Sequence, residues 1–402
     1  QSVAQNTQSA HQLTQSCYIA TNGKIIVNAG GHYTTSISEQ VFLRDSLHGS
    51  MYDTVSNSFK TNKKSNFSYD AGGLLIASET STLDKNGISW TNSIQATYKY
   101  TGFQLNEESF KSWDKTLANW INYTRYLYSY ETDNTLSSIF NQPWDTDSLV
   151  WKYSTKDLIV YDQNMNVASV ANQKWNKNLN SWDNYQQVVF TYSGGNISEK
   201  NYRIWNKSNQ VWDEYQKESI SYSNNKKAEV ITQVKSGTSD WVNYSRLVYV
   251  YGNEGLSDVT EYLWSGSWAE NRKYLYSYNS NSMESSVVTQ FWAAHLNSFR
   301  NQSQEESFYT QRVVFGTSEI PSGTFFVNNP VSKQLGFTIG GLVENKSYQV
   351  RLVSLNGSLV LNKPIKSGEF ITPNSQLPVG IYMLSIQAPG TKTSMLKVLI
   401  TE

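Results

Sequence analysis

The chain has 402 residues, of which 16% are charged and 14% aromatic, with 33 basic and 33 acidic residues. This charge balance argues against nucleic-acid binding as the main task, because that task needs a basic surface. The single cysteine, Cys17, excludes an intramolecular disulfide, and no run of 18 apolar residues predicts a transmembrane segment. The high contents of Tyr, Trp, Asn and Ser favour strands and turns over helices.

Residues 1–30 are rich in Gln, Ser and Thr at first and then contain an apolar run, Lys24-Ile25-Ile26-Val27. We expect a flexible start followed by a strand that caps the repeats, since terminal repeats need covering. The chain starts at Gln1 rather than Met, which fits a secreted protein after signal-peptide removal and fits a trimmed chain equally well.

An internal repeat fills residues 31–315. In seven units a Trp precedes a Tyr by about ten residues, and in two more units Phe59 and Phe299 replace the Trp. The nine units recur every 27–31 residues, and their column tyrosines are Tyr69, Tyr100, Tyr130, Tyr161, Tyr192, Tyr222, Tyr251, Tyr278 and Tyr309. A second column lies mostly seven residues before the first, and together the two columns hold all 13 tryptophans.

Each unit is predicted to be an antiparallel hairpin. Turn formers such as Asn206–Asn209 separate the two columns, so the two rings are expected to pair across a hairpin tip. A second turn follows each column Tyr, and the next apolar residue is expected to begin the return strand. The Trp, the residue two before the Tyr, and the Tyr itself are mostly separated by even numbers, which predicts one shared, buried face.

Nine hairpins give roughly eighteen strands, more than an open twisted sheet usually holds. The predicted fold class is therefore all-β, with a tandem hairpin array forming a coiled meander, a spiral or an open barrel. The turns after Tyr69 and Tyr251 resemble the YD repeats of RHS-type extracellular proteins, and the double-Trp hairpin resembles the Trp- and Tyr-rich repeats of secreted Bacteroidetes proteins. The YD resemblance is partial, and it implies a β-meander that coils into a shell.

A second domain is predicted for residues 320–402, where Val, Leu, Ile, Gly and Pro replace the Trp pattern. Tyr348–Val353 alternates as a strand does, and Asn356-Gly357 is a strong hairpin signal. About seven short strands in some 80 residues predict a small Ig-like β-sandwich.

This domain resembles the type A C-terminal sorting domain of the type IX secretion system, because four motifs follow one another in the family's order. The opening departs from the family pattern, since Asn328 stands where the first Pro is usual. The motif residues are Asn329, Pro330, Asn356, Gly357, Leu377, Pro378, Gly380, Tyr382 and Lys397. The resemblance implies export across a Bacteroidetes outer membrane, docking on an outer-membrane shuttle protein, and cleavage by a sortase that anchors or releases the cargo. The expected location is the outer cell surface or the medium.

No motif for catalysis, a metal or a cofactor is found in the sequence. The four histidines lack metal-ligand spacing, and Gly-x-Ser-x-Gly, Walker and His-Glu-x-x-His patterns are absent. Asp145 and Asp147 alone do not provide a complete set of oxygen ligands for Ca²⁺. Glu107 and Glu108 are adjacent, so in a strand they point to opposite faces and cannot form a glycosidase dyad. We therefore expect a protein without enzymatic activity, metal or cofactor.

A Tyr and Asn stripe is the candidate contact surface. Its tyrosines follow the column Trp by three residues, an odd spacing that predicts the solvated face unless a bulge intervenes. The stripe consists of Tyr123, Tyr185, Tyr215 and Tyr244 with Asn122, Asn184 and Asn243 beside them.

The Trp columns themselves have two interpretations. They can be packing ladders between neighbouring hairpins, or exposed rings that stack on sugars. The leading hypothesis is a non-catalytic binding or adhesion protein with a glycan or protein ligand. A carbohydrate-binding protein that uses exposed Trp and Tyr is the alternative, and a secreted hydrolase is less favoured.

Overall fold

The computed structural model describes residues 11–12, 17–20, 25–27, 39–70, 72–102, 104–132, 135–236, 240–314, 331–332, 337–339, 347–354, 359–366, 369–371, 380–387 and 394–401. No helical segment among these residues has the length and hydrophobicity of a membrane span. One compact unit comprises residues 1–31, 44–70 and 74–310, and the other comprises residues 32–43, 71–73 and 311–402.

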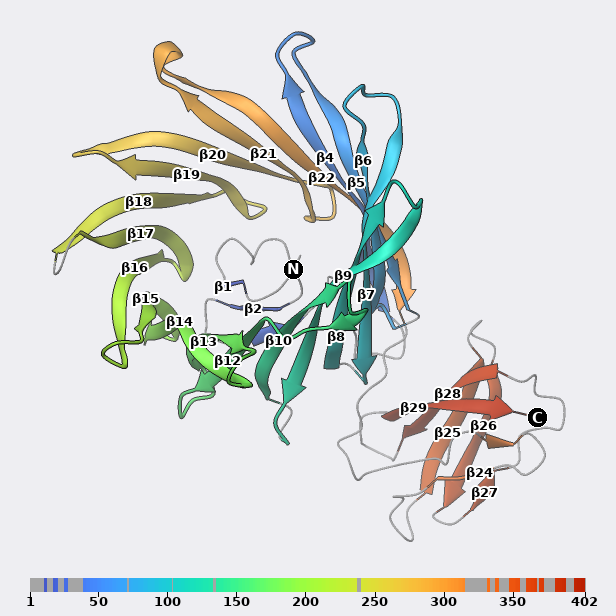
Figure 1. The fold of residues 1–402 in the computed structure, drawn as a ribbon. Helices are drawn as coiled ribbons and strands as arrows, with labels where there is room; N and C mark the ends of the chain where they lie inside the picture. Colours follow the sequence, from blue (N-terminus) through green and yellow to red (C-terminus); the bar gives the residue numbers. More distant parts are fainter. Residues whose placement is uncertain are drawn as a thin grey trace. The chain divides into compact units, whose positions relative to one another are not determined.

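The repeats form one closed antiparallel barrel, in which each strand pairs with its neighbours in chain order (Figure 1). β11 and β12 both pair with β10 and are two segments of one interrupted strand, so the barrel has 18 strands. The segments are β4 Glu39–Asp53, β5 Ser58–Tyr69, β6 Leu75–Leu83, β7 Trp90–Thr101, β8 Gln104–Asp114, β9 Asn119–Tyr130, β10 Leu136–Asp145, β11 Val150–Trp151, β12 Thr155–Tyr161, β13 Val167–Asn176, β14 Ser181–Ser193, β15 Asn196–Asn206, β16 Val211–Ser223, β17 Lys226–Ser236, β18 Asp240–Tyr251, β19 Leu256–Trp264, β20 Trp268–Tyr278, β21 Glu284–Ala293 and β22 Ser298–Val314. The short 3-10 helix η1, Ala294–Leu296, lies between the last two strands.

The predicted all-β hairpin array is confirmed, and the sheet is closed because β22 is the neighbour of β4. Arg44 of β4 donates a hydrogen bond to the hydroxyl of Tyr309 in β22, and the rings of His48 and Phe308 lie 4.6 Å apart. Closure leaves neither terminal hairpin with an open edge.

The expected cap strand does not join the barrel. Ile25–Val27 forms β3, which belongs to a separate three-stranded sheet with β1, His11–Gln12, and β2, Cys17–Ile19. The physical need for a cap is removed, because the first and last hairpins of the barrel are neighbours of each other.

Ring pairs close the hairpins as predicted. Trp113 is opposite Trp120, and Trp264 is opposite Trp268 despite the shorter loop. Their ring centroids lie 5.1 and 5.0 Å apart in edge-to-face geometry. The hairpin of β17 and β18 is the exception, because Lys235 rather than the predicted Val234 is opposite Trp241. Its ammonium group lies 5.4 Å from the centre of a Trp241 ring.

The column tyrosines form a hydrogen-bonded ladder at the other rim. The hydroxyls of Tyr69, Tyr100, Tyr130, Tyr161, Tyr192, Tyr222, Tyr278 and Tyr309 each donate to a backbone carbonyl 22 or 25 residues earlier, at 2.7–3.0 Å. Most of the acceptors are the first or second residue of a return strand, as Val167 and Leu105 are, and these two residues are buried. Each bond therefore ties the second strand of a hairpin to the start of its first strand, as Tyr192 of β14 does to Val167 of β13.

A bulge in each hairpin changes the predicted face of the tryptophans. Trp175 is opposite Trp182, and Val170 is opposite Val188, so the Trp pair and the core lie on opposite faces of β13. Tyr185 is the extra residue on β14 between these two pairings, which shifts the alternation by one. The expectation of one shared face is therefore wrong.

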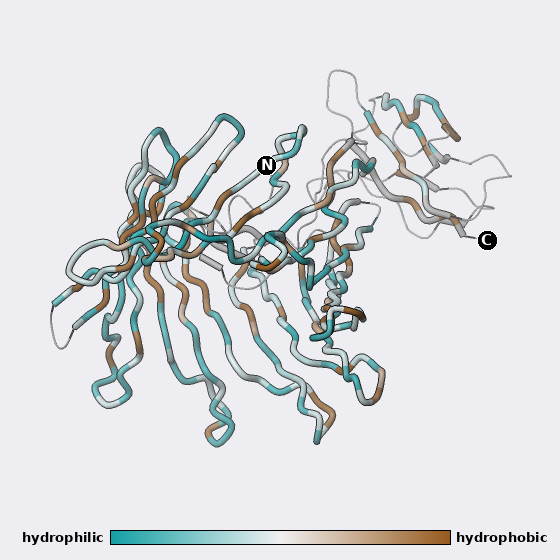
Figure 2. Tube along the Cα trace, turned by 90° about the horizontal axis from the view of Figure 1, so that it is seen from above, coloured by the Kyte–Doolittle hydropathy of each residue, from teal (hydrophilic) through white to brown (hydrophobic). Residues whose placement is uncertain are grey.

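We call the two surfaces of the barrel wall the Tyr face and the Trp face. The Tyr face carries the core cluster, which includes Leu105, Val170 and Tyr249, whereas the Trp face carries the Trp pairs. Several Tyr-face side chains, such as Val167, are almost fully buried although they belong to a single sheet. Side chains converge on the concave side of a closed sheet, so the Tyr face is the inner face. Viewed from above, apolar and polar residues alternate along many of the strands (Figure 2).

The C-terminal domain has seven described strands, as predicted. Five form one sheet in the order β23-β29-β28-β25-β26, and two form a second sheet, β24-β27. The strands are β23 Val331–Ser332, β24 Phe337–Thr338, β25 Ser347–Ser354, β26 Leu359–Lys366, β27 Phe370–Ile371, β28 Gly380–Gln387 and β29 Ser394–Thr401. Val350, Leu352, Leu384 and Val398 are fully buried in its core.

Candidate binding surfaces

The four tyrosines of the predicted stripe share one structural position, the bulge residue of their hairpin. The pairings skip Tyr123, Tyr185, Tyr215 and Tyr244. Because a bulge intervenes, Tyr185 and Tyr215 lie on the Tyr face rather than on the opposite one. Lys174 lies 3.3 Å from the centre of the Tyr185 ring, and Tyr215 packs against the ring of Tyr202 at 6.5 Å.

The tyrosine stripe differs in accessibility along its length. Tyr123 and Tyr244 are 57% and 56% exposed, whereas Tyr185 and Tyr215 are half-buried. The side-chain amide of Gln186 donates to the Tyr215 hydroxyl at 3.5 Å, which links two hairpins. This inner stripe therefore remains a candidate for ligand contact.

The predicted asparagines lie on the Trp face, away from these tyrosines. Asn184 and Asn243 accept cross-strand hydrogen bonds from Gln173 and Gln233 at 3.0 and 2.9 Å. Asn122 holds the equivalent position opposite Lys111. The structure thus separates the two halves of the predicted stripe onto opposite faces, because the bulge residue follows each asparagine.

An aromatic patch on the Trp face was not predicted from the sequence. It consists of Phe140, Tyr153, Trp175 and Trp182, whose ring centroids lie 5.0–6.0 Å from their neighbours. Tyr153 is 47% exposed, and the other three rings are half-buried. Four converging rings offer an apolar platform at the surface of the wall.

Pro143 accounts for the exposure of Tyr153. A proline has no backbone N–H to donate to a neighbouring strand, so the pairing of β10 is interrupted between β11 and β12. Two backbone hydrogen bonds flank the unpaired stretch. The N–H of Lys152 donates to the Pro143 carbonyl, and the N–H of Ser154 donates to the Asn141 carbonyl. Tyr153 lies between these two anchors.

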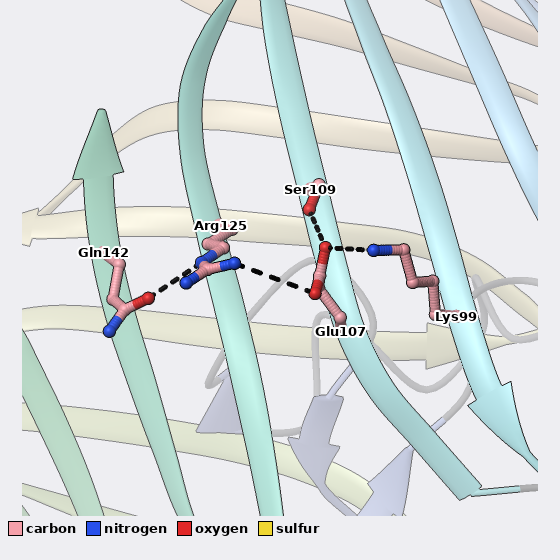
Figure 3. Close-up of polar contacts among 5 residues, drawn as sticks. All are labelled: Lys99, Glu107, Ser109, Arg125 and Gln142. Carbon is pink, nitrogen blue, oxygen red and sulfur yellow. Dashed lines mark hydrogen bonds and ion pairs between the residues drawn. The ribbon is translucent and has the colours of Figure 1, made fainter. Parts of the chain in front are cut away.

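A polar network lies on the same face and reaches β10, the strand that also carries Phe140 of the patch. Figure 3 shows the five residues of this network. Glu107 accepts hydrogen bonds from Lys99 at 2.9 Å and from Ser109 at 2.6 Å, and its second oxygen lies 3.9 Å from Arg125. Arg125 donates to Gln142 at 2.8 Å. The Arg125 guanidinium also lies 4.9 Å from the centre of a Trp151 ring, which connects the network to the neighbouring Trp pair.

The network keeps Glu107 ionised. Burial opposes the charged form, but hydrogen bonds from Ser109 and Lys99 and the positive charges of Lys99 and Arg125 lower the pKa of Glu107 overall. A fixed carboxylate, a guanidinium and an amide therefore lie close to half-buried rings, that of Trp151 and, on the strand of Gln142, that of Phe140. This combination can hydrogen-bond hydroxyl groups while the rings pack on an apolar ligand surface.

Other candidate residues have structural roles. Asp145 accepts the backbone N–H groups of Asp147 and Ser148 and pairs with Lys152, so it caps a hairpin tip. Glu108, next to Glu107, is fully buried on the Tyr face and accepts a hydrogen bond from Tyr128 at 2.7 Å. Among the residues that the structure describes, no three metal-ligating side chains come together.

The sorting motif is described in part. Tyr382 is buried in the core of the C-terminal domain, and Gly380 and Lys397 lie in β28 and β29. The remaining predicted motif residues lie outside the described ranges: Asn329, Pro330, Asn356, Gly357, Leu377 and Pro378.

Residues 329–401 match the family described as secretion system C-terminal sorting domain. This segment is a type IX secretion C-terminal sorting domain, so the chain is secreted across the outer membrane to the surface or the medium. The likeness of the repeats to YD repeats stays a prediction. A comparison with curated proteins finds no match to the chain.

Three solved structures share limited similarity with the chain. A protein of unknown function from Bacteroides fragilis is 19% identical over 32% of this chain and 91% of its own, with a TM-score of 0.28. A DUF3836 family protein from Bacteroides vulgatus is 22% identical over 22% and 89%, with a TM-score of 0.20. A porin-like protein from Bacteroides uniformis is 10% identical over 70% and 100%, with a TM-score of 0.34. These likenesses support no inference about function.

Proposed function

We propose that this protein is a non-catalytic binding or adhesion protein, delivered to the cell surface or the medium by the type IX system. The observation that carries the proposal is the aromatic patch of Phe140, Tyr153, Trp175 and Trp182 on the outer face of the barrel. Packing alone would favour burial of a ring this large, yet Tyr153 is 47% exposed. An exposed aromatic platform beside fixed polar groups is typical of a contact surface.

A glycan is the ligand class that the patch favours. Sugar rings present C–H groups to aromatic faces and hydroxyls to charged and amide groups. Glu107, Arg125 and Gln142 supply such groups on strands next to the rings. We therefore propose that carbohydrate binding underlies the adhesion.

The full chain on a glycan array, followed by titration calorimetry with the best glycan, tests the proposal. We expect Tyr153→Ala to weaken binding at least tenfold, because the stacking of an aromatic ring on a sugar contributes on the order of 1 kcal/mol or more. Tyr244→Ala, on the inner stripe, is the matched control and should bind as the wild type does. Loss of binding in Tyr244→Ala alone would transfer the site to the Tyr face. Absence of any glycan binding, or hydrolysis of the glycan, would refute the proposal.

The sorting domain implies interaction with the type IX machinery. We propose specifically that an outer-membrane shuttle protein recognises it and that a sortase removes it. Mass spectrometry of the protein from its native cells tests the second step. An intact C-terminus on surface-displayed molecules would contradict cleavage.

A further inference from the structure

The described hairpin tips that follow the ring pairs lie at one rim of the barrel, because the chain alternates between two rims in an antiparallel meander. At this rim six tips each carry one apolar side chain that is between 48% and 95% exposed. We call this set the apolar rim; it consists of Val55, Ile88, Leu117, Leu149, Leu179 and Leu296. Apolar colour reaches several hairpin ends in Figure 2.

Closure of the barrel makes the apolar rim continuous. Leu296 lies between β21 and β22, and β22 neighbours β4, so its tip is next to that of Val55. The six tips are therefore consecutive around the ring. The tip between β15 and β16 is polar, Lys207–Gln210, and the tip between β19 and β20 is Ser265-Gly266-Ser267. One arc of the rim is apolar and another arc is polar.

The turn geometry does not require these apolar residues. Four of the apolar tips share an Asp- or Asn-capped four-residue loop with the polar tip 207–210, and in each the last loop residue has a positive φ: Asn57, Ala118, Leu149, Asn180 and, in the polar tip, Gln210. A capping Asp or Asn holds each loop, as Asp114 does for the N–H groups of Thr116 and Leu117. The polar tip makes the same turn with no apolar residue, so the fold alone does not explain the leucines.

Leu149 strengthens this argument. Its φ is +54°, a left-handed conformation that is unfavourable for a large side chain and that Asn or Gly adopts more readily. An apolar residue held there at 67% exposure contributes little to the barrel core. A role outside the chain accounts for it better.

The spacing of the tips decides the kind of partner. Neighbouring tips are at least about 10 Å apart, since two strands separate them, and polar residues such as Lys115 and Asn178 lie between the apolar ones. Six side chains of on the order of 100 Å² each give at most roughly 600 Å² in separate pieces. Each partner in a stable protein pair buries about 800 Å² of fitted surface. A second copy of the chain is therefore a poor match, whereas a fluid lipid layer accepts separate side chains without shape complementarity.

The residues behind the tips fit a lipid surface too. Ring pairs follow five of the six apolar tips, with centroids 4.9–5.2 Å apart: Tyr52–Phe59, Trp113–Trp120, Trp144–Trp151, Trp175–Trp182 and Trp292–Phe299. The polar tips have the same pairs, Trp205–Trp212 and Trp264–Trp268, so the tip side chains alone distinguish the apolar arc. Trp and Tyr favour the boundary between lipid headgroups and acyl chains. Lys85 and Lys115 are balanced at the same tips by Asp84 and Asp114, so the contact is carried by the apolar side chains rather than by charge.

We propose that the apolar rim rests on a lipid bilayer surface, with the tip side chains dipping into it and the ring pairs at the headgroup level. This contact is independent of the ligand patch on the Trp face. It orients the barrel with the polar arc of the rim away from the lipid.

Flotation of the full chain with phosphatidylcholine–phosphatidylglycerol vesicles tests the proposal. We expect the wild type to float with the vesicles, and the triple variant Leu117→Ser, Leu149→Asn, Leu179→Ser to partition at least tenfold less. The matched control is Met165→Ser, which removes a 46% exposed apolar side chain from a turn at the opposite rim and should partition as the wild type does.

A gain-of-binding variant keeps the test decisive if the triple variant folds poorly. Asn209→Leu places an apolar residue on the polar tip and should raise partitioning about threefold. A wild type that stays out of the vesicle fraction would overturn the proposal, as would a well-folded triple variant that floats normally. Dimers of the wild type that dissociate in the triple variant would assign the rim to a second copy of the chain instead.

Discussion

The hydroxyl of Tyr192 donates a hydrogen bond of 2.7 Å to the backbone carbonyl of Val167. Val167 is fully buried, so its carbonyl has little access to water. Seven other column tyrosines make the equivalent bond. The phenol thus combines a ring that packs on the Tyr face with a hydroxyl that satisfies a backbone acceptor.

Tyr192→Phe should lower the free energy of unfolding by about 1–3 kcal/mol, because the carbonyl of Val167 then loses its partner while it stays buried. Urea denaturation followed by tryptophan fluorescence measures this change. Tyr244→Phe alters a 56% exposed side chain and should change stability by less than about 0.5 kcal/mol. Equal effects of the two variants would mean that the ladder bonds contribute nothing.

Lys227 should make stability rise with pH. Burial, assisted by the charge of Lys200, lowers the pKa of Lys227 to about 7, against about 10.4 in an unfolded chain. Between these values the unfolded chain binds a proton that the folded chain does not, so stability increases with pH by at most about 1.4 kcal/mol per unit. Below pH 7 both states are protonated and the dependence ends.

Lys227→Met should remove this slope and be more stable than the wild type at pH 7. Urea denaturation at several pH values from 7 to 10 measures the difference, which is expected to shrink as the pH rises. Lys226→Met, at the exposed neighbouring position, should keep the wild-type slope. A constant difference between wild type and Lys227→Met at all pH values would contradict the assignment.

The Trp pairs should be energetically coupled. Trp205 and Trp212 lie 5.0 Å apart with their planes at 64°. A double-mutant cycle with Trp205→Ala and Trp212→Ala is expected to give a coupling of about 0.5–1.5 kcal/mol. A second cycle that combines Trp205→Ala with Trp264→Ala, from a distant hairpin, should give none. Similar couplings in both cycles would point to a general loosening of the barrel rather than to ring contact.

Leu149→Asn should stabilise the barrel. Relief of the left-handed conformation at Leu149 is expected to raise the free energy of unfolding by about 1 kcal/mol. Leu179→Asn makes the same chemical change at a tip position without a positive φ and should leave stability nearly unchanged. Thermal unfolding of both variants checks the contrast. Loss of stability in Leu149→Asn would show that the leucine packs within the protein.

The periodicity predicted the hairpins well, because ring pairs and turn residues are local features. Trp113 and Trp120, for example, lie opposite each other at the predicted spacing. The face of the tryptophans could not be predicted by counting, since one unpaired residue such as Tyr185 reverses the alternation. The same residue was singled out in the sequence for its odd spacing, which is the only sequence signal of the bulge.

Register at the return strands was harder to predict where polar residues are buried. The backbone acceptors are Glu284 for Tyr309 and Lys227, in the preceding strand β17, for Tyr251. The predicted positions were the neighbouring apolar residues Met283 and Ala228. Both charged residues are at most 6% exposed. A pattern that assumes apolar residues inside assigns such strands one residue out of register.

One sequence feature, Pro143, could have indicated where the aromatic patch lies. Pro143 is the only proline before residue 320, and a lone proline within a strand pattern indicates an interruption. The closing contact of β22 with β4 had no local signal, because it joins segments some 250 residues apart in the chain. Long-range pairings of this kind are not encoded in the spacing of one repeat.

Ring closure also constrains how the protein can vary. An open row of hairpins can gain or lose a unit at either end, but in a ring the strand number, tilt and stagger must agree around the whole circumference. Duplication or loss of one hairpin would therefore require every remaining strand to adjust, and the bond between Arg44 and Tyr309 would have to form at a new curvature. Related proteins of different length are accordingly expected to differ in their loops, or by whole-barrel rebuilding, rather than by simple trimming of a terminal repeat.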